Sequence, residues 1–269
     1  MTHSSVHPDQ ADGRYLLLLD ILGFSQLVET RGHQEVYATI EKAFEPFRHW
    51  ERLNGCFQTI YFSDTFVYYQ KSKGFHKSLF LDIYAIGGMV LSALLAEGIP
   101  ARGAISFGEF NVNADSSGRH QLYYGGAMIE AHRAEQREKW IGITMLPSAW
   151  KPYEESEPGN INVFASDGAW LRRADDVLLL NPFIKLNSWG SLIEVPGEVQ
   201  RPYSQHDTDL ATDLRGLKFL HDTAQGFAER NDFLSPEAVK YHVTVQFLKK
   251  VLGKRLFDWA EYAVEPDNF

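Results

Sequence analysis

The stretch Arg14–Glu29, RYLLLLDILGFSQLVE, constrains the fold more than any other part of the chain. Residues 14–20 form a short, nearly continuous apolar run, which is typical of a strand that is buried on both faces. The run ends on a single carboxylate, Asp20, and a Leu-Gly-Phe turn follows it at once. Residues with helical spacing come next. The stretch therefore predicts a strand, a tight turn and a helix, with an acid at the end of the strand.

Apolar patterns along the next part of the chain predict an alternation of strands and helices. We expect a helix from Ser25 to about Trp50, followed by a hairpin of the strands Phe57–Ser63 and Thr65–Gln70. A helix at Leu79–Leu95 and a strand at Ala101–Phe110 come next. A loop at 113–120, a helix at 125–139 and a strand at 140–144 follow. The order β-α-β-β-α-β is that of the ferredoxin-like split βαβ unit. The expected fold class is thus α+β, with helices on one face of an open sheet and a second subunit often covering the other face.

The length of 269 residues indicates one large domain or one domain with an extension. We expect residues 1–13 to be a disordered tail and residues 14–145 to form the main domain. Residues 146–269 would complete or extend it, as an irregular segment with a strand at Val177–Leu180 and two C-terminal helices. Ser235 is the expected N-cap of the second helix, with proline at its first position.

Composition excludes several classes of protein. A net charge of -9 argues against non-specific binding to nucleic acid, because phosphate contacts need a basic surface. Cys56 is the only cysteine, so neither an intrachain disulfide nor a cysteine-based zinc cluster can form. The first residues are polar, and the longest nearly uncharged apolar run, Ile83–Ala96, is too short to span a bilayer. We expect a cytoplasmic protein that binds neither nucleic acid nor a membrane.

Asp64 lies at the predicted tip of the hairpin. In a split βαβ unit the first strand is next to that hairpin, so Asp20 and Asp64 are expected to converge at one edge of the sheet. Two converging carboxylates repel each other unless a cation lies between them, and Mg²⁺ binds carboxylates together with substrate phosphates. Gly23 lets the backbone approach a ligand closely, and the amides of Leu22–Phe24 open a helix where phosphate binds. The alternative for a lone Asp20 is an N-cap or turn residue.

Four segments together carry a family resemblance: LDILGF, FSDT, PARGAISFGEF and YYGGAMIEAHRAE. They resemble the catalytic domain of class III nucleotidyl cyclases. Within that group they look most like the pyrimidine cyclases of the Pycsar anti-phage system. The resemblance covers about residues 14–145.

The resemblance implies roles for individual residues. Asp20 and Asp64 would bind two Mn²⁺ or Mg²⁺ ions, and Ile21 would add its backbone carbonyl. The family carries an Asn and an Arg four residues apart on one helical face, and both act on the transition state. The arginine falls on Arg133, whereas the asparagine position holds Ile129, so this chain departs from the full constellation.

The purine-reading positions depart from the family as well. Ile60 stands where purine cyclases carry a Lys, and Leu122 stands where an Asp reads adenine. This loss fits either a different base or an inactive enzyme, and the intact pair of acids together with Arg133 favours a different base. Aromatic residues such as Tyr61 could stack on a smaller ring, although ordinary sheet core is the alternative reading for them.

Two further cations are candidate substrate ligands. Arg102 lies on an otherwise apolar strand and needs a partner. It could contact a substrate phosphate or a pyrimidine carbonyl, or it could pair with Glu109 or another acid. Lys139 lies near the position where the family has a triphosphate-binding lysine, although its spacing along the sequence is shorter than in the family.

The resemblance implies a reaction and its partners. A homodimer with composite sites would convert UTP, or else CTP, to the 3′,5′-cyclic monophosphate and pyrophosphate, and the product would activate a separate effector in anti-phage defence. Three alternatives remain: a cyclase of the same family acting on ATP or GTP, a catalytically silent regulatory module, and a small-ligand binding protein whose motifs arose by chance.

Overall fold

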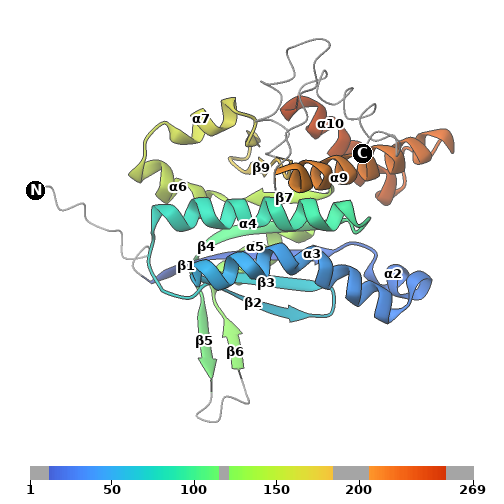
Figure 1. Cartoon of the computed structure of the whole chain (residues 1–269). Helices are drawn as coiled ribbons and strands as arrows, with labels where there is room; N and C mark the ends of the chain where they lie inside the picture. The colour runs from blue at the N-terminus through green and yellow to red at the C-terminus, as the bar shows by residue number, and fades with distance from the viewer. Residues whose placement is uncertain (1–11, 115–120, 184–205, 253–269) are drawn as a thin grey trace, which may run out of the picture.

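The computed structural model describes residues 12–114, 121–183 and 206–252 (Figure 1). Its strands are β1 (Gly13–Ile21), β2 (Phe57–Phe62), β3 (Thr65–Gln70), β4 (Ala101–Glu109), β5 (Asn111–Ala114), β6 (Gln121–Tyr124), β7 (Gly142–Met145), β8 (Trp170–Arg172) and β9 (Leu178–Leu180). Its helices are α2 (Phe24–Arg31), α3 (His33–Asn54), α4 (Lys77–Ala96), α5 (Gly126–Arg137), α6 (Pro147–Ser156), α7 (Asn160–Ser166), α9 (His206–Glu229) and α10 (Pro236–Val251).

One mixed sheet organises the protein, with the strand order β2-β3-β1-β4-β7-β9-β8. β1 pairs antiparallel with both β3 and β4, and β2 pairs antiparallel with β3. These four strands have the order and directions of a ferredoxin-like split βαβ unit. The predicted α+β fold class is therefore confirmed. β7 continues the sheet by pairing parallel with β4.

Helices cover both faces of the sheet. Alternate residues of β1, such as Leu17 and Leu19, belong to the large core on the side of α3 and α4. The residues between them, Leu16 and Leu18, pack with Ala127 and other small residues of α5. The expectation that helices lie on one face only was wrong, because the small side chains of α5 let it pack closely on the second face.

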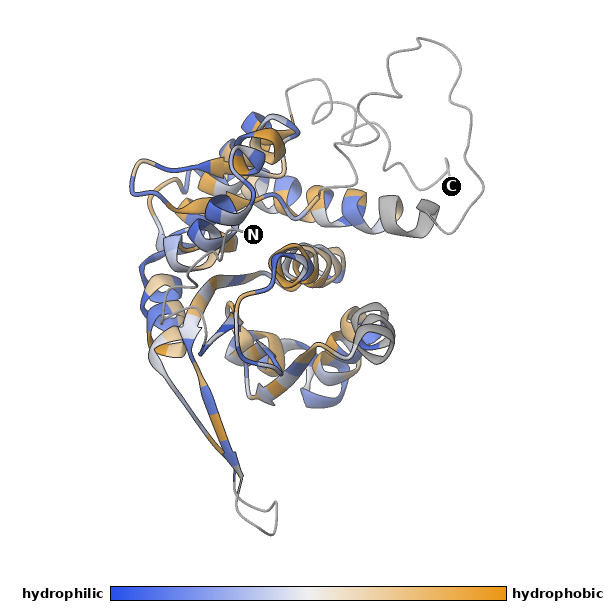
Figure 2. Cartoon of the chain, turned by 90° about the vertical axis from the view of Figure 1, so that its left-hand side faces the viewer, coloured by the Kyte–Doolittle hydropathy of each residue, from blue (hydrophilic) through white to orange (hydrophobic). Residues whose placement is uncertain are grey.

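Several local predictions need correction. The long helix expected from Ser25 is two helices, because the chain turns at Gly32 with φ +82°. Part of the expected loop at 113–120 belongs to an arm in which β5 and β6 pair, while residues 115–120 lie outside the described residues. Figures 1 and 2 show this arm projecting from the body. Gly13, expected in a disordered tail, already pairs with Glu109; residues 1–11 are not described.

The C-terminal part extends the sheet and its helical layer. The expected strand at Val177–Leu180 is confirmed as β9, which pairs with β7. α6, α7 and β8 fold within the stretch expected to be irregular, and residues 184–205 are outside the described part. α9 packs along α4, where Ser92 donates a hydrogen bond to Asp213. The predicted cap of α10 is confirmed, since Ser235 Oγ accepts from Ala238 N–H at 3.2 Å.

α4 is the only helix within the described residues that is long and apolar enough to cross a membrane. Two-thirds of its apolar window is buried inside the protein, at 67%. This burial is what a core helix between the sheet and α9 requires.

Candidate active site

Three residues form a row at one end of the neighbouring central strands β3, β1 and β4. Asp20 lies opposite Thr65 on one side and opposite Arg102 on the other. All three are on the face that α5 covers, because they follow the same alternation as Leu16 and Leu18. Thr65 Oγ1 donates a hydrogen bond to Asp20 Oδ1 at 3.5 Å. The end of β1 therefore presents a carboxylate between a hydroxyl and a guanidinium.

Asp64 lies beside Asp20 because the hairpin turns tightly next to the end of β1. Ser63 and Asp64 alone connect β2 to β3, and Ser63 adopts φ +56°. The N–H of Ile21 donates to the carbonyl of Asp64 at 2.9 Å, which ties the hairpin tip to the strand end. The charge of Asp64 also acts on the pKa of Asp20. The structure thus brings the two acids to one edge.

Asp20 is held in a setting that disfavours its charged form. Burial raises its pKa most, and the negative charges of Glu135 and Asp64 raise it further. Arg102 and the hydrogen bond from Thr65 lower it, and the balance raises the pKa of Asp20 to about 6. A carboxylate in such a setting gains stability when a cation approaches it.

Arg102 pairs with an acid of this chain. Its Nε donates to Glu135 Oε1, and its Nη1 donates to the carbonyl of Glu138 at 3.0 Å. Glu135 is only 1% exposed, so the pair is buried between α5 and β4. The sequence left open whether Arg102 contacts substrate or pairs with an acid, and the structure shows it paired with an acid. That acid is not Glu109.

Glu135 is the residue of the site that sequence reasoning missed. It raises the pKa of Asp20 and holds Arg102. The sequence spacing could have revealed this residue, because Ala127, Ala131 and Glu135 follow one another at intervals of four and therefore share one helical face. They are the buried residues of α5. An acid that continues a buried helical stripe needs a buried partner.

The glycine turn is only partly available to a ligand. Gly23 has φ +69° and precedes α2, whose bond from Leu27 N–H to Gly23 O measures 3.0 Å. The N–H of Leu22 donates to Pro100 O at 2.8 Å, so this amide is already occupied. The expected phosphate contact through Leu22 therefore does not fit. The amides of Gly23 and Phe24 precede the first intrahelical bond and remain as donors.

Arg133 and Lys139 lie elsewhere. Arg133 and Ile129 are exposed on α5, on the side turned away from its buried stripe. Within the described residues, the side chain of Arg133 makes no hydrogen bond or ion pair that ties it to this chain. Lys139 is exposed just after α5. The structure brings neither cation into the row that contains Asp20.

The residues proposed for the base lie on different surfaces. Tyr61 packs edge-on against Phe44 and Phe66, with ring centroids 5.7 and 5.3 Å apart, on the α3 side of the sheet. It therefore lies on the face opposite Asp20. Ile60 is half-buried on the α5 side, and Leu122 is 62% exposed on the arm.

Comparisons with families of known sequences and with curated proteins find no match. Among solved structures, the chain is similar to a guanylyl cyclase domain of a RhoGC fusion protein from Blastocladiella emersonii. The identity is 14%, over 54% of this chain and 84% of that chain, with a TM-score of 0.46. The guanylate cyclase domain of RhGC from Catenaria anguillulae, in complex with GTP, is 14% identical over 52% of this chain and 81% of that chain, with a TM-score of 0.44. An adenylate cyclase from Trypanosoma brucei is 15% identical over 67% of this chain and 94% of that chain, with a TM-score of 0.46.

These solved structures are distant in sequence and partial in overlap. The assignment of function therefore rests on the residues of this chain.

Proposed function

We propose that this protein is a nucleotidyl cyclase, which forms a 3′,5′-cyclic mononucleotide and pyrophosphate from a nucleoside triphosphate. The observation that carries the proposal is the convergence of Asp20 and Asp64 at one sheet edge, directly before the Gly23 turn. Two acids beside free backbone amides suit a substrate that carries both phosphates and bound cations.

The donor set fits Mg²⁺ or Mn²⁺. Asp20 and Asp64 supply carboxylate oxygens, and hard cations commonly take one or two carboxylates together with substrate phosphates. Within the described residues, no group of three or more His, Cys, Asp or Glu side chains forms a cage that would hold a metal by itself. The site thus suits ions that arrive with a triphosphate. Ile21 would contribute its backbone carbonyl.

The bound ions, the backbone amides and the buried ion pair would have different roles in the reaction. Bound divalent ions would lower the pKa of the ribose 3′-hydroxyl and offset phosphate charge. The amides of Gly23 and Phe24 would orient the phosphate tail. Glu135 and Arg102 would fix α5 against β4 beside Asp20.

Arg133 would act from a second copy of the chain. It is exposed and turned away from the acids of its own subunit, so a composite site in a homodimer would bring it to the substrate. Positioned cations stabilise the charge that develops in phosphoryl transfer. Lys139, exposed after the same helix, is a second candidate for the triphosphate.

We infer that the base is a pyrimidine, with UTP favoured over CTP by the family resemblance. Ile60 and Leu122 offer no polar group that could read a purine edge. Tyr61 takes no part in this inference, because it packs on the opposite face. The cyclic pyrimidine would then serve as a messenger for a separate effector in anti-phage defence.

The test is incubation of the purified protein with each of the four nucleoside triphosphates and Mn²⁺, with products identified by mass. The proposal expects a cyclic pyrimidine mononucleotide and its loss in Asp64→Asn. A cyclic purine product would leave the cyclase assignment standing and refute the base. Absence of any cyclic product would favour the silent regulatory module.

Mixing two inactive variants tests the composite site. Asp20→Ala subunits and Arg133→Ala subunits should together regain part of the activity, because some sites in mixed dimers receive both intact halves. No rescue at any ratio, with mixed dimers verified, would contradict shared sites.

A further inference from the structure

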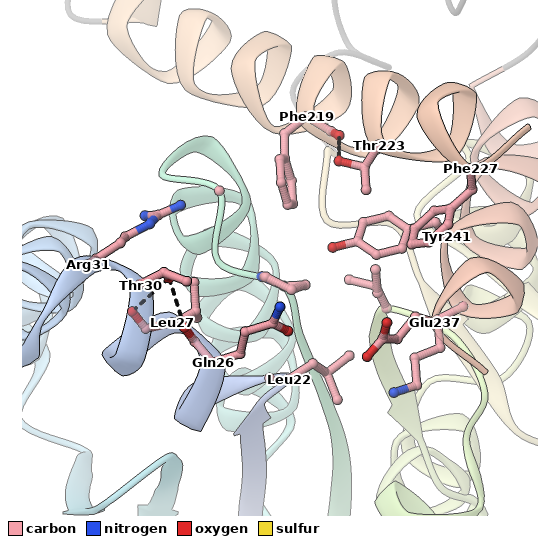
Figure 3. A pocket seen from close by; sticks show the side chains of 15 residues that line it. Leu22, Gln26, Leu27, Thr30, Arg31, Phe219, Thr223, Phe227, Glu237 and Tyr241 are labelled. Carbon is pink, nitrogen blue, oxygen red and sulfur yellow. Dashed lines mark hydrogen bonds between the residues drawn. The ribbon is translucent and has the colours of Figure 1, made fainter. Parts of the chain in front are cut away.

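A cavity of about 370 Å³ separates the start of α2 from the C-terminal helices α9 and α10 (Figure 3). It lies at the junction between the split βαβ unit and the C-terminal extension, a setting in which small-molecule sites are common. Its size is within the range of such sites. Neither Asp20 nor Asp64 lines the cavity, so it lies beside the Asp20 site and shares with it only the turn at Leu22 and Gly23.

One wall of the cavity is aromatic. Tyr241 of α10 packs against Phe219 and Phe227 of α9, with ring centroids 6.0 and 5.7 Å apart. Figure 3 shows these three side chains lining the side of the cavity opposite α2. Aromatic faces and edges of this kind accept a planar ring by stacking or edge contacts.

Polar groups converge on the same space from both sides. Gln26 of α2 projects toward the cavity and faces Tyr241 and Glu237 of α10 (Figure 3). An amide offers both donors and an acceptor, while a carboxylate offers acceptors only. Burial raises the pKa of Tyr241 to about 12, so its hydroxyl stays protonated and can donate. These groups suit a ring whose edge carries both N–H donors and acceptors.

A cation completes the lining. Lys240 lines the cavity one helical turn after Glu237, and it is half-buried. Among the residues that the structure describes, neither of these side chains forms an ion pair. The two opposite charges are therefore available to a ligand that has a donor-bearing ring and an anionic group.

We propose that this cavity binds a mononucleotide, a planar heteroaromatic base with an anionic phosphate, at a site separate from the acids of β1. The base would lie against Tyr241 and Phe219, with its edge toward Gln26 and Glu237, and the phosphate would bind Lys240. The cavity includes Leu22 and Gly23, which follow Asp20 directly in the chain. An occupant therefore touches the turn that leads out of the catalytic strand.

The test is calorimetric titration of the full chain in EDTA with UMP, CMP, AMP and GMP, and with their 3′,5′-cyclic forms. We expect saturable binding of at least one of them, with a Kd on the order of 10–100 µM for a ligand of this size. Preference for a cyclic form would identify the product of a cyclase as the ligand, and preference for a linear form would identify a free metabolite.

Matched variants locate the binding. Gln26→Trp fills the cavity from an exposed helical position, and Lys240→Glu reverses the charge at the phosphate. Each should weaken binding at least about tenfold, the effect of losing one good charged contact. The controls Gln225→Trp and Lys218→Glu place the same changes on exposed positions of α9 outside the cavity and should bind as the wild type does.

The proposal would be overturned if none of the eight nucleotides bound saturably, or if the wild type and Gln26→Trp bound with equal affinity. Asp20→Asn separates this site from the proposed active site, and it should keep the binding. Loss of binding in Asp20→Asn would place the nucleotide at the acids instead and would also refute the inference. Because no metal or triphosphate is used, failure of the cyclase assay leaves this test unaffected.

Discussion

Replacing Asp20 with Asn should stabilise the metal-free protein at neutral and alkaline pH. Folding raises the pKa of Asp20 from its ordinary value of 3.8 to about 6, because burial and the charges of Glu135 and Asp64 oppose ionisation. The ionised form therefore costs free energy in the folded state. Asn keeps the size of the side chain and its acceptor for Thr65 but removes the charge.

The size of the effect follows from the two pKa values. A difference between 3.8 and about 6 corresponds to about 3 kcal/mol once Asp20 is fully ionised. Asp20 is only half-buried, so solvent screening reduces this figure to about 1 kcal/mol. In a protein of this size, that is a rise in the melting temperature of about 2–4 °C.

The sign of the effect depends on pH. Below about pH 3.8, Asp20 is protonated in both the folded and unfolded states, and the two proteins should be equally stable. As the pH rises from about 4 to about 6, the unfolded chain ionises before the folded one, so the wild type loses stability relative to Asp20→Asn. Above about pH 6 the difference should stay constant.

Thermal unfolding in EDTA at pH 4, 5, 6 and 8 measures this profile. In a separate series without EDTA, Mn²⁺ added together with a non-hydrolysable nucleoside triphosphate should raise the melting temperature of the wild type more than that of Asp20→Asn, because binding to the folded state alone stabilises it. Asp222→Asn, an exposed change on α9, is the control and should show neither effect. A variant that is less stable than the wild type at pH 8 in EDTA would refute the account of Asp20.

Three further changes test the supporting structure by chemical denaturation. Glu135→Gln leaves Arg102 without its buried acid and should lower the free energy of unfolding by about 3 kcal/mol; a loss below 0.5 kcal/mol would mean that the pair contributes little. Gly125→Ala should cost about 3 kcal/mol, because Gly125 has φ +150° and an added Cβ would collide with the backbone of Glu109; Gly126→Ala, with open space around the Cβ, is its control. Ser235→Ala removes the cap of α10 and should cost about 1 kcal/mol, and an unchanged stability would contradict the role of the 3.2 Å bond to Ala238.

Local sequence patterns determined the elements of this protein. The apolar run of 14–20, the paired strands around Ser63-Asp64 and the helical spacing after Lys77 each have a period that one backbone conformation satisfies. Their order limited the topology to a split βαβ unit, and this placed Asp20 near Asp64. The cap at Ser235 was equally readable, because a cap depends only on adjacent residues.

Tertiary structure decided which groups face the acids. Glu135 reaches Arg102 only because α5 packs on the second face of the sheet, and Tyr61 lies opposite Asp20 because a strand turns each successive side chain over. The occupied amide of Leu22 depends on Pro100, far along the chain. The cavity beside α2 depends on how the C-terminal helices close over it. Such contacts join residues that are distant in sequence, so their formation depends on the packing of whole elements, and no local period encodes it.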